Sequence, residues 1–230
     1  STTIFTIVLD AAPNSNVTID VSSDDAAAAS VDLANVSFDN TNWNVAQTIT
    51  VTGEQDADLN DESVIITLSL DASASDDIFD ALAAQTVTAT VTDDDTASFT
   101  VDKTSITVSE DATNTFSIVL NAEPNSNVIF DMATATSEIS FDLAQLTFNS
   151  TNWNVSQTVT VSASETGVQT DLSGTITVSV NGASDSDFTG LTDHSISVTI
   201  NSVNDQPVIT AQTALTTPEE TDLTITLADL

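Results

Sequence analysis

The sequence Thr41-Asn42-Trp43-Asn44-Val45 returns almost unchanged as Thr151-Asn152-Trp153-Asn154-Val155. The two tryptophans of the chain therefore stand 153 − 43 = 110 residues apart. A repeat of this length indicates two copies of one structural unit, because about 110 residues is the size of an independent β-sandwich domain. The chain of 230 residues then holds two units and a remainder.

Apolar side chains alternate with threonine or serine along both units. Ile49 and Val51, for example, lie between Thr48, Thr50 and Thr52. This alternation is typical of a half-buried antiparallel strand, and the Asn, Asp, Pro and Ser residues between such runs are typical of turns. The sequence therefore predicts an all-β protein made of tandem antiparallel β-sandwiches of the immunoglobulin-like class, each with seven or eight strands. Residues 80–84 are predicted to form one helical turn at most.

Acidic residues outnumber basic ones by 35 to 1, which gives a formal net charge of −34. This charge excludes nucleic acid as a partner, because phosphate binding needs basic side chains. It also disfavours binding to anionic lipid, and no apolar run approaches the ~18 residues of a membrane span, so no membrane insertion is expected. Hydrophobic residues make up 40% of the chain, which disfavours disorder.

The repeat predicts a first unit at residues 1–95, a second unit at residues 96–205 and the start of a third unit at residues 206–230. The second unit opens with two predicted segments, residues 97–101 and 105–111, that have no counterpart before the Phe5 strand of the first unit. Two interpretations remain open. The chain is a segment of a longer tandem protein, or its tail strand near residues 221–227 completes the first unit of a neighbouring chain by strand addition.

Three motifs point to a known family: Val108-Ser109-Glu110-Asp111 at the opening of a unit, Asn-Trp-Asn-Val before a Gln-Thr-Ile/Val-Thr-Val strand, and Thr92-Asp93-Asp94-Asp95 at the close of a unit. Through them, residues 1 to about 203 resemble the Calx-beta-type modules of very large bacterial surface proteins and adhesins. Residues 204–220 are similar to the start of cadherin-like repeats. The resemblance implies an extracellular or cell-surface location and Ca²⁺ binding by clustered acids at one end of each sandwich.

The loop of residues 54–62 carries acids at five of its nine positions, whereas the equivalent loop of residues 164–172 carries two. Carboxylates about 4 Å apart repel by about 1 kcal/mol per pair even in water, and Ca²⁺ takes roughly six to eight oxygen ligands. We therefore expect the stronger site in the first unit; the alternative is that the acids only keep the protein soluble. The candidate ligands are Asp56, Asp58, Asp61, Glu62, Asp93, Asp94 and Asp95 in the first unit, and Glu110, Asp171 and Asp205 in the second.

Trp43 and Trp153 are predicted to anchor their strands at the core or its rim, with glycan stacking on an exposed ring as the alternative. Asn42, Asn44, Asn152 and Asn154 are expected to fix turns through side-chain-to-backbone bonds. His194 is the only histidine, and no motif places a nucleophile or a base, so no enzyme is expected.

The function favoured by these observations is a non-catalytic extracellular spacer stiffened by Ca²⁺, whose partners are neighbouring modules of the same or an identical chain. One alternative is a filament subunit that assembles head to tail by strand exchange. The other is a module that binds a glycan or a surface ligand.

Overall fold

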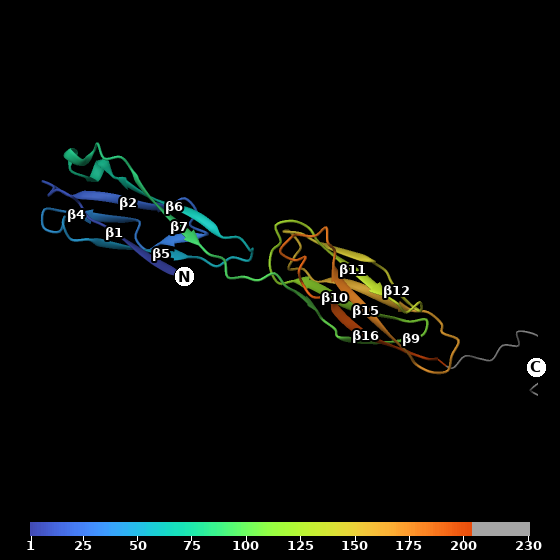
Figure 1. Ribbon diagram of the computed structural model, residues 1–230. Coiled ribbons are helices and arrows are strands. Elements are labelled where there is room, and N and C mark those ends of the chain that lie inside the picture. Colours follow the sequence, from blue (N-terminus) through green and yellow to red (C-terminus); the bar gives the residue numbers. More distant parts are fainter. Residues whose placement is uncertain (204–230) are drawn as a thin grey trace, which may run out of the picture.

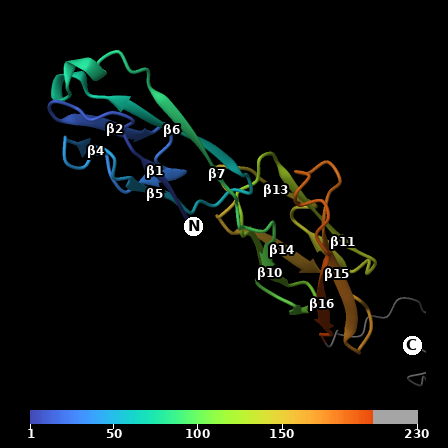
Figure 2. The same ribbon diagram turned by 60° about the vertical axis from the view of Figure 1, so that its left-hand side comes forward.

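The computed structural model describes residues 1–203, which form two elongated β-sandwiches placed end to end (Figures 1 and 2). The first sandwich, here called the first unit, packs the sheet β1-β5-β3 against the sheet β4-β2-β6-β7. Its strands are β1 (Thr2–Ile7), β2 (Val17–Ser23), β3 (Ala29–Val31), β4 (Asn35–Phe38), β5 (Gln47–Gly53), β6 (Glu62–Leu70) and β7 (Gln85–Val91).

The second unit packs the sheet β12-β14-β10-β8 against the sheet β13-β11-β15-β16-β9. Its strands are β8 (Phe99–Val101), β9 (Ser105–Ser109), β10 (Thr113–Leu120), β11 (Val128–Thr134), β12 (Ile139–Phe141), β13 (Gln145–Phe148), β14 (Gln157–Ala163), β15 (Leu172–Val180) and β16 (His194–Asn201). All pairs are antiparallel except β9 with β16, which is parallel.

The alternation of the sequence sets which side chains are buried. In β5, Ile49 and Val51 are buried, whereas Thr48, which precedes Ile49, is exposed. The all-β fold predicted from this pattern is confirmed. Within residues 1–203, the structure contains no helix of the length and apolar character needed to cross a bilayer.

Each unit has its own core. The second core is richer in large side chains, with Phe116, Phe130, Phe148 and Phe188 all fully buried. Phe130 lies edge-on between two other rings, with ring centroids 4.8 Å from Phe99 and 5.9 Å from Phe148. Such edge-to-face pairs contribute about 0.5–1.5 kcal/mol beyond the burial of their area.

Several details differ from the sequence-based expectations. The second unit has nine strands rather than seven or eight, because β8 and β9 both join its sheets. Residues 80–84 form no helix, which agrees with the expectation of one turn at most, but short 3₁₀ helices that were not predicted occupy Ala72–Ala74 and Asp77–Phe79, where Asp71 and Asp76 cap the first amides. The predicted third unit, residues 206–230, lies outside the described residues, as does Asp205.

Phe5 and Phe116 occupy equivalent positions in β1 and β10, but Phe116 is fully buried and Phe5 only half-buried. We expect Phe116→Ala to lower the free energy of unfolding of its unit by about 3–5 kcal/mol, and Phe5→Ala to cost less because the ring has less buried surface to lose. Denaturant titrations followed by tryptophan fluorescence measure each unit separately in Trp43→Phe and Trp153→Phe backgrounds. Equal losses would contradict the difference in burial.

Candidate metal centre

Three carboxylates converge at the end of the first unit that faces the second. Asp56 and Asp58 lie in the loop between β5 and β6, and Asp93 follows β7; one oxygen from each lies within 4.8 Å of the others. Strand pairing explains the convergence, because Glu62 at the start of β6 pairs with Val91 at the end of β7. The two acidic segments therefore meet at one end of the sandwich, as the resemblance to Calx-beta-type modules implies.

Hydrogen bonds from backbone amides fix the two segments. The Asp93 amide donates to Asp61 Oδ1 at 2.9 Å, which ties the segment after β7 to the loop before β6. The Asp95 amide donates to Asp93 Oδ1 at 2.8 Å, and the Asn60 amide donates to Asp58 Oδ1 at 2.8 Å. These bonds orient the carboxylates but leave oxygens free to bind a cation.

The charges of this cluster act on one another. Partial burial, together with the charges of Asp56, Asp58 and Asp93, raises the pKa of Glu62 above its ordinary value. Partial burial also raises the pKa of Asp93, and the charges of Asp95, Asp56 and Asp58 add to the effect. The carboxylates of Asp56, Asp58, Glu62 and Asp93 are called the acidic cluster below.

The donor set of the acidic cluster suits a hard cation. Carboxylate oxygens are the ligands that Ca²⁺ prefers, and its flexible geometry accepts water in the remaining positions of a shell of roughly six to eight oxygens. Asp61, Asp94 and Asp95 lie beside the cluster. Asp61 accepts the Asp93 amide, and Asp94 Oδ1 accepts the Gln55 side-chain amide at 3.0 Å.

The candidate ligands Glu110 and Asp171 of the second unit accept hydrogen bonds from nearby amide and hydroxyl groups. Glu110 is buried, and its two carboxylate oxygens accept hydrogen bonds from the amide and hydroxyl of Thr166 and from the Val203 amide. The Thr166 side chain and the Val203 amide together hold its pKa below the ordinary value. Asp171 Oδ1 accepts the Ser202 amide at 3.0 Å. Among residues 1–203, the structure brings neither residue into a group of three carboxylates.

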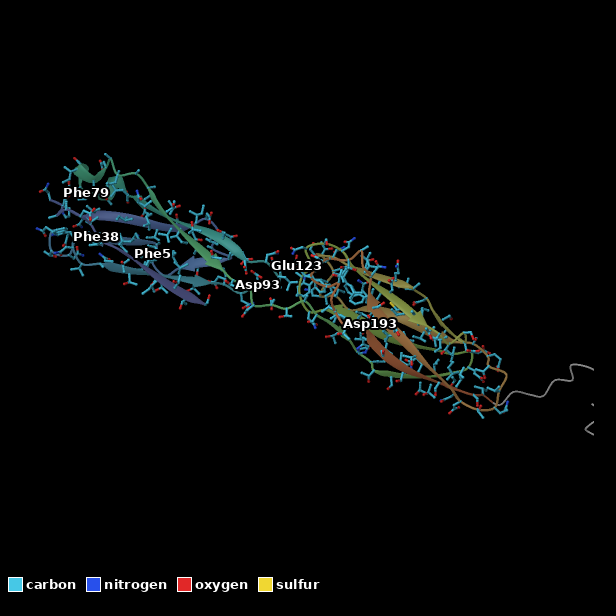
Figure 3. All side chains as sticks on the ribbon, viewed as in Figure 1. Phe5, Phe38, Phe79, Asp93, Glu123 and Asp193 are labelled. Atoms are coloured by element: carbon cyan, nitrogen blue, oxygen red, sulfur yellow. The ribbon has the colours of Figure 1, made fainter. Side chains whose placement is uncertain are left out.

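The loop that carries the acidic cluster also contacts the second unit. The Glu123 amide donates to the Ala57 carbonyl at 2.7 Å, and the side-chain amides of Asn60 and Asn125 exchange hydrogen bonds of 2.9 and 3.0 Å. Leu59 packs against the core of the second unit. Figure 3 shows Asp93 and Glu123 at this junction. The contact with the second unit was not predicted from the sequence, which has no signal for an interface between loops.

The tryptophan motif is structural in both units. Trp43 and Trp153 are half-buried against their cores, as predicted, and their carbonyls accept the amides of Leu9 and Leu120. The predicted turn bonds are confirmed for Asn42 and Asn152, because their side-chain oxygens accept the amides of Asp39 and Asn149 at 2.6 and 2.7 Å.

His194 and Lys103, the only histidine and the only lysine of the chain, both make hydrogen bonds within the second unit. His194 Nε2 lies 3.0 Å from the Lys103 carbonyl, and Lys103 Nζ donates to Asn114 Oδ1 at 3.1 Å and to the Thr115 carbonyl. Both contacts lie between β9, β10 and β16, and they hold these strands together.

No protein-family model matches the chain, and no curated protein matches it. Three solved structures show similarity at low TM-score. The Escherichia coli chaperone DraB matches with a TM-score of 0.36 and 6% identity over 47% of this chain and 57% of its own. The Caenorhabditis elegans MSP family member WR4 matches at 0.32 and 10%, over 44% and 96%, and the fibronectin(III)-like modules of Clostridium thermocellum CbhA match at 0.27 and 9%, over 91% and 100%.

The raised pKa values of Glu62 and Asp93 predict an unusual pH dependence in the absence of divalent cations. A carboxylate with a higher pKa in the folded state makes the folded protein bind more protons, so stability falls as the pH rises. Lowering the pH from about 7 toward about 5 in chelator should therefore raise the melting temperature of the first unit. Hydrogen bonds, first from the Ser73 hydroxyl to Asp71 and from the Ile78 amide to Asp76, lower the pKa of these two carboxyls. Their contribution to stability is lost only when the pH falls toward their ordinary pKa of 3.8, so it does not oppose the expected rise in melting temperature above that pH.

The control for this measurement is the double variant Glu62→Gln with Asp93→Asn, which keeps the shape of both side chains and removes their titration. It should melt at a higher temperature than the wild type at neutral pH in chelator, and its stability should vary less between the two pH values. A wild-type melting temperature that falls steadily on acidification over this range would contradict the assignment.

Proposed function

We propose that this chain is a non-catalytic structural segment of an extracellular protein, in which Ca²⁺ bound at the acidic cluster stiffens the junction between two β-sandwiches. One observation carries the proposal: residues 54–62 supply Asp56 and Asp58 to the cluster and also make the polar and apolar contacts with the second unit. A cation that fixes this loop therefore acts directly on the interface.

Charge repulsion supports a cation at this place. Four carboxylates share the acidic cluster, and no ammonium or guanidinium group lies nearby in sequence, since Lys103 is the only basic side chain of the chain. With the cluster empty, each close pair of like charges favours opening of the loop. A divalent cation replaces that repulsion by attraction and holds residues 54–62 against the segment after β7.

The loop contacts explain how local binding changes the shape of the whole molecule. A short linker, residues 92–98, joins β7 to β8, and such a linker alone leaves the two sandwiches free to bend. The Asn60–Asn125 amide pair, the Glu123–Ala57 backbone bond and the packing of Leu59 restrict that bending only while the loop keeps its conformation. The proposed role is therefore mechanical, and it requires no exposed binding pocket.

Addition of Ca²⁺ to the metal-free protein should raise the melting temperature of the first unit. A ligand that binds only the folded state adds about 2.7 kcal/mol at 100 times its Kd. Asp56→Asn and Asp93→Asn should each weaken this effect strongly, because each loses a charged ligand but keeps its hydrogen-bond acceptor. Asp20→Asn is the matched control, since it removes the same charge from an exposed position in β2. Unchanged melting of the wild type on addition of Ca²⁺ or chelator would refute the proposal.

Leu59→Ser separates cation binding from stiffening. It removes the apolar contact with the second core but leaves every carboxylate of the acidic cluster in place. The variant should bind Ca²⁺ with nearly wild-type affinity by calorimetry, yet small-angle X-ray scattering should show a more flexible pair of units in Ca²⁺. Scattering identical to that of the wild type would mean that the loop contacts do not restrict bending.

A further inference from the structure

The two units differ at their sheet edges. In the second unit, β8 pairs with β10 and β9 pairs with β16. In the first unit, β1 corresponds to β10 and β7 corresponds to β16. Both β1 and β7 lie at the edges of their sheets and pair on one side only. Among residues 1–203, the first unit therefore has no counterpart of β8 and β9, and two strand edges remain open for pairing.

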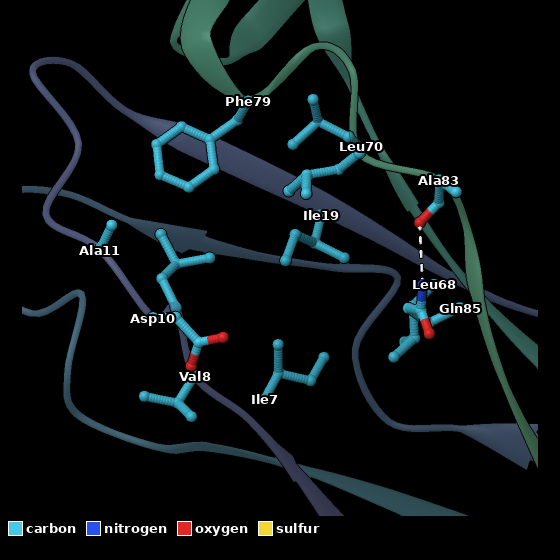
Figure 4. Close-up of a pocket in the computed structure, with 12 residues that line it drawn as sticks. Ile7, Val8, Asp10, Ala11, Ile19, Leu68, Leu70, Phe79, Ala83 and Gln85 are labelled. Carbon is cyan, nitrogen blue, oxygen red and sulfur yellow. Dashed lines mark hydrogen bonds between the residues drawn. The ribbon is translucent and has the colours of Figure 1, made fainter.

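A cavity of about 330 Å³ lies where β8 would pack on the first unit. Its apolar walls include Ile7, Ile19, Leu68 and Phe79 (Figure 4). The equivalent residues of the second unit are Ile118, Phe130, Val178 and Phe188, all fully buried. Phe99 of β8 covers this position in the second unit, with its ring 4.8 Å from that of Phe130 and its backbone paired with Leu120.

Two further cavities continue along the path of the missing strands. One of about 80 Å³ is lined by Ala89 and Val91 of β7, the counterparts of Val198 and Ile200. In the second unit, Ile106 pairs with Val198 and Val108 pairs with Ile200, and the side chains of Ile106 and Val108 are buried.

The other cavity, of about 510 Å³, is lined by Thr92 and Asp94 among others. Their counterparts, Asn201 and Val203, are the residues that Glu110 bonds in the second unit: its amide donates to the Asn201 carbonyl and its carboxylate accepts the Val203 amide. The three cavities together follow the course of Phe99, Ile106, Val108 and Glu110. We call them the acceptor groove.

A matching donor sequence is present in the tail of the chain. Phe99, Ile106, Val108 and Glu110 are spaced by 7, 2 and 2 residues, and the same spacing recurs in Val208, Leu215, Thr217 and Glu219. Thr104, Thr107 and Glu110 are identical to Thr213, Thr216 and Glu219 in this alignment, which needs no gap. The tail therefore has apolar residues at the positions of Phe99 and Ile106, a threonine at that of Val108 and a glutamate at that of Glu110.

The distance along the sequence from the end of one unit to the first residue of the donor pattern is the same at both junctions. Thr92 precedes Phe99 by 99 − 92 = 7 residues, and its counterpart Asn201 precedes Val208 by 208 − 201 = 7 residues. When the tail of one chain fills the groove of another with this spacing, the first unit of the other chain follows the second unit of the donor. The placement is then the same as that of the second unit after the first within one chain. The tail thus has the length needed to continue the array at the same junction.

The tail of a chain cannot reach the acceptor groove of that same chain. The chain leaves the second unit at the end away from the first (Figure 1), and the five residues from Val203 to Val208 reach at most about 18 Å. Strand β16 alone, with 8 residues, spans about 26 Å, and the acceptor groove lies beyond it on the first unit. A tail that fills the acceptor groove therefore belongs to a second copy of the chain.

We propose that the acceptor groove of the first unit binds residues 207–219 of a second copy, which pair with β1 and β7 as β8 and β9 pair in the second unit, so that chains join head to tail. Backbone pairing provides affinity in such strand addition, and pockets for alternate side chains provide specificity.

The test is the mass of the full-length chain against concentration, measured by sedimentation velocity in Ca²⁺ at about 0.15 M salt, which screens repulsion between the acidic chains to about 8 Å. The average mass should rise with concentration. Leu215→Asp, which puts a charge where Ile106 is buried, should remain at the monomer mass of 23.9 kDa. Thr216→Asp is the matched control and should associate like the wild type, because its counterpart Thr107 is exposed.

A labelled peptide of residues 206–220 identifies the groove directly. It should bind the Leu215→Asp chain in fluorescence anisotropy, and the same peptide carrying Leu215→Asp should not. Deleting residues 221–230 from the full chain should leave association intact. A wild type that stays monomeric at every concentration would overturn the proposal. So would binding of a peptide of residues 97–111 without binding of the peptide of residues 206–220, because the groove would then take a different strand.

Discussion

The fold holds carboxylates close together, against their mutual repulsion, at the end of the first sandwich that faces the second. Asp56, Asp58 and Asp93 lie within 4.8 Å of one another in the folded protein, and partial burial removes some of the water that would screen them. Folding of the β6–β7 pair forces this approach, because the strands align the loop before one with the segment after the other. The fold thus creates a site whose charge a cation would balance.

The two units share the features that form the sandwich and differ in the features proposed to carry function. Both units keep the tryptophan turn, the capping aspartates before the turn at Phe79 and Phe188, and the buried faces of their strands. They differ in the acidic loop and in the edge strands. Because the fold tolerates both versions, neither the acidic cluster nor the open edges of the first unit are needed to form a sandwich.

The features with a strong local signal were predictable from the sequence. Ile49 and Val51 alternate with threonines, and this pattern alone establishes a strand and its buried face. The convergence of residues 54–62 with Asp93 also followed from the resemblance to a known family. The short strand β3 has only three residues and too few positions to show a period.

Other features depend on contacts between distant residues, which no local pattern encodes. Glu110 was expected as a metal ligand, but the structure surrounds its carboxylate with the Thr166 and Val203 donors, 56 and 93 residues away. The parallel pairing of β9 with β16, and the packing of Leu59 on the second core, are of the same kind. These partners lie far apart along the chain, so the sequence around each residue does not show them.

The acidic cluster lies next to the acceptor groove, because Gln55, which precedes Asp56, lines the groove. In the second unit, Glu110 accepts hydrogen bonds from Thr166, whose counterpart in the first unit is Asp56. A donor glutamate at that position, Glu219 of a second copy, would face a carboxylate in place of a hydroxyl. Two adjacent carboxylates favour association only when a cation binds both. Strand donation would then add a ligand to the acidic cluster, and by linkage cation binding and chain association would strengthen each other by the same factor.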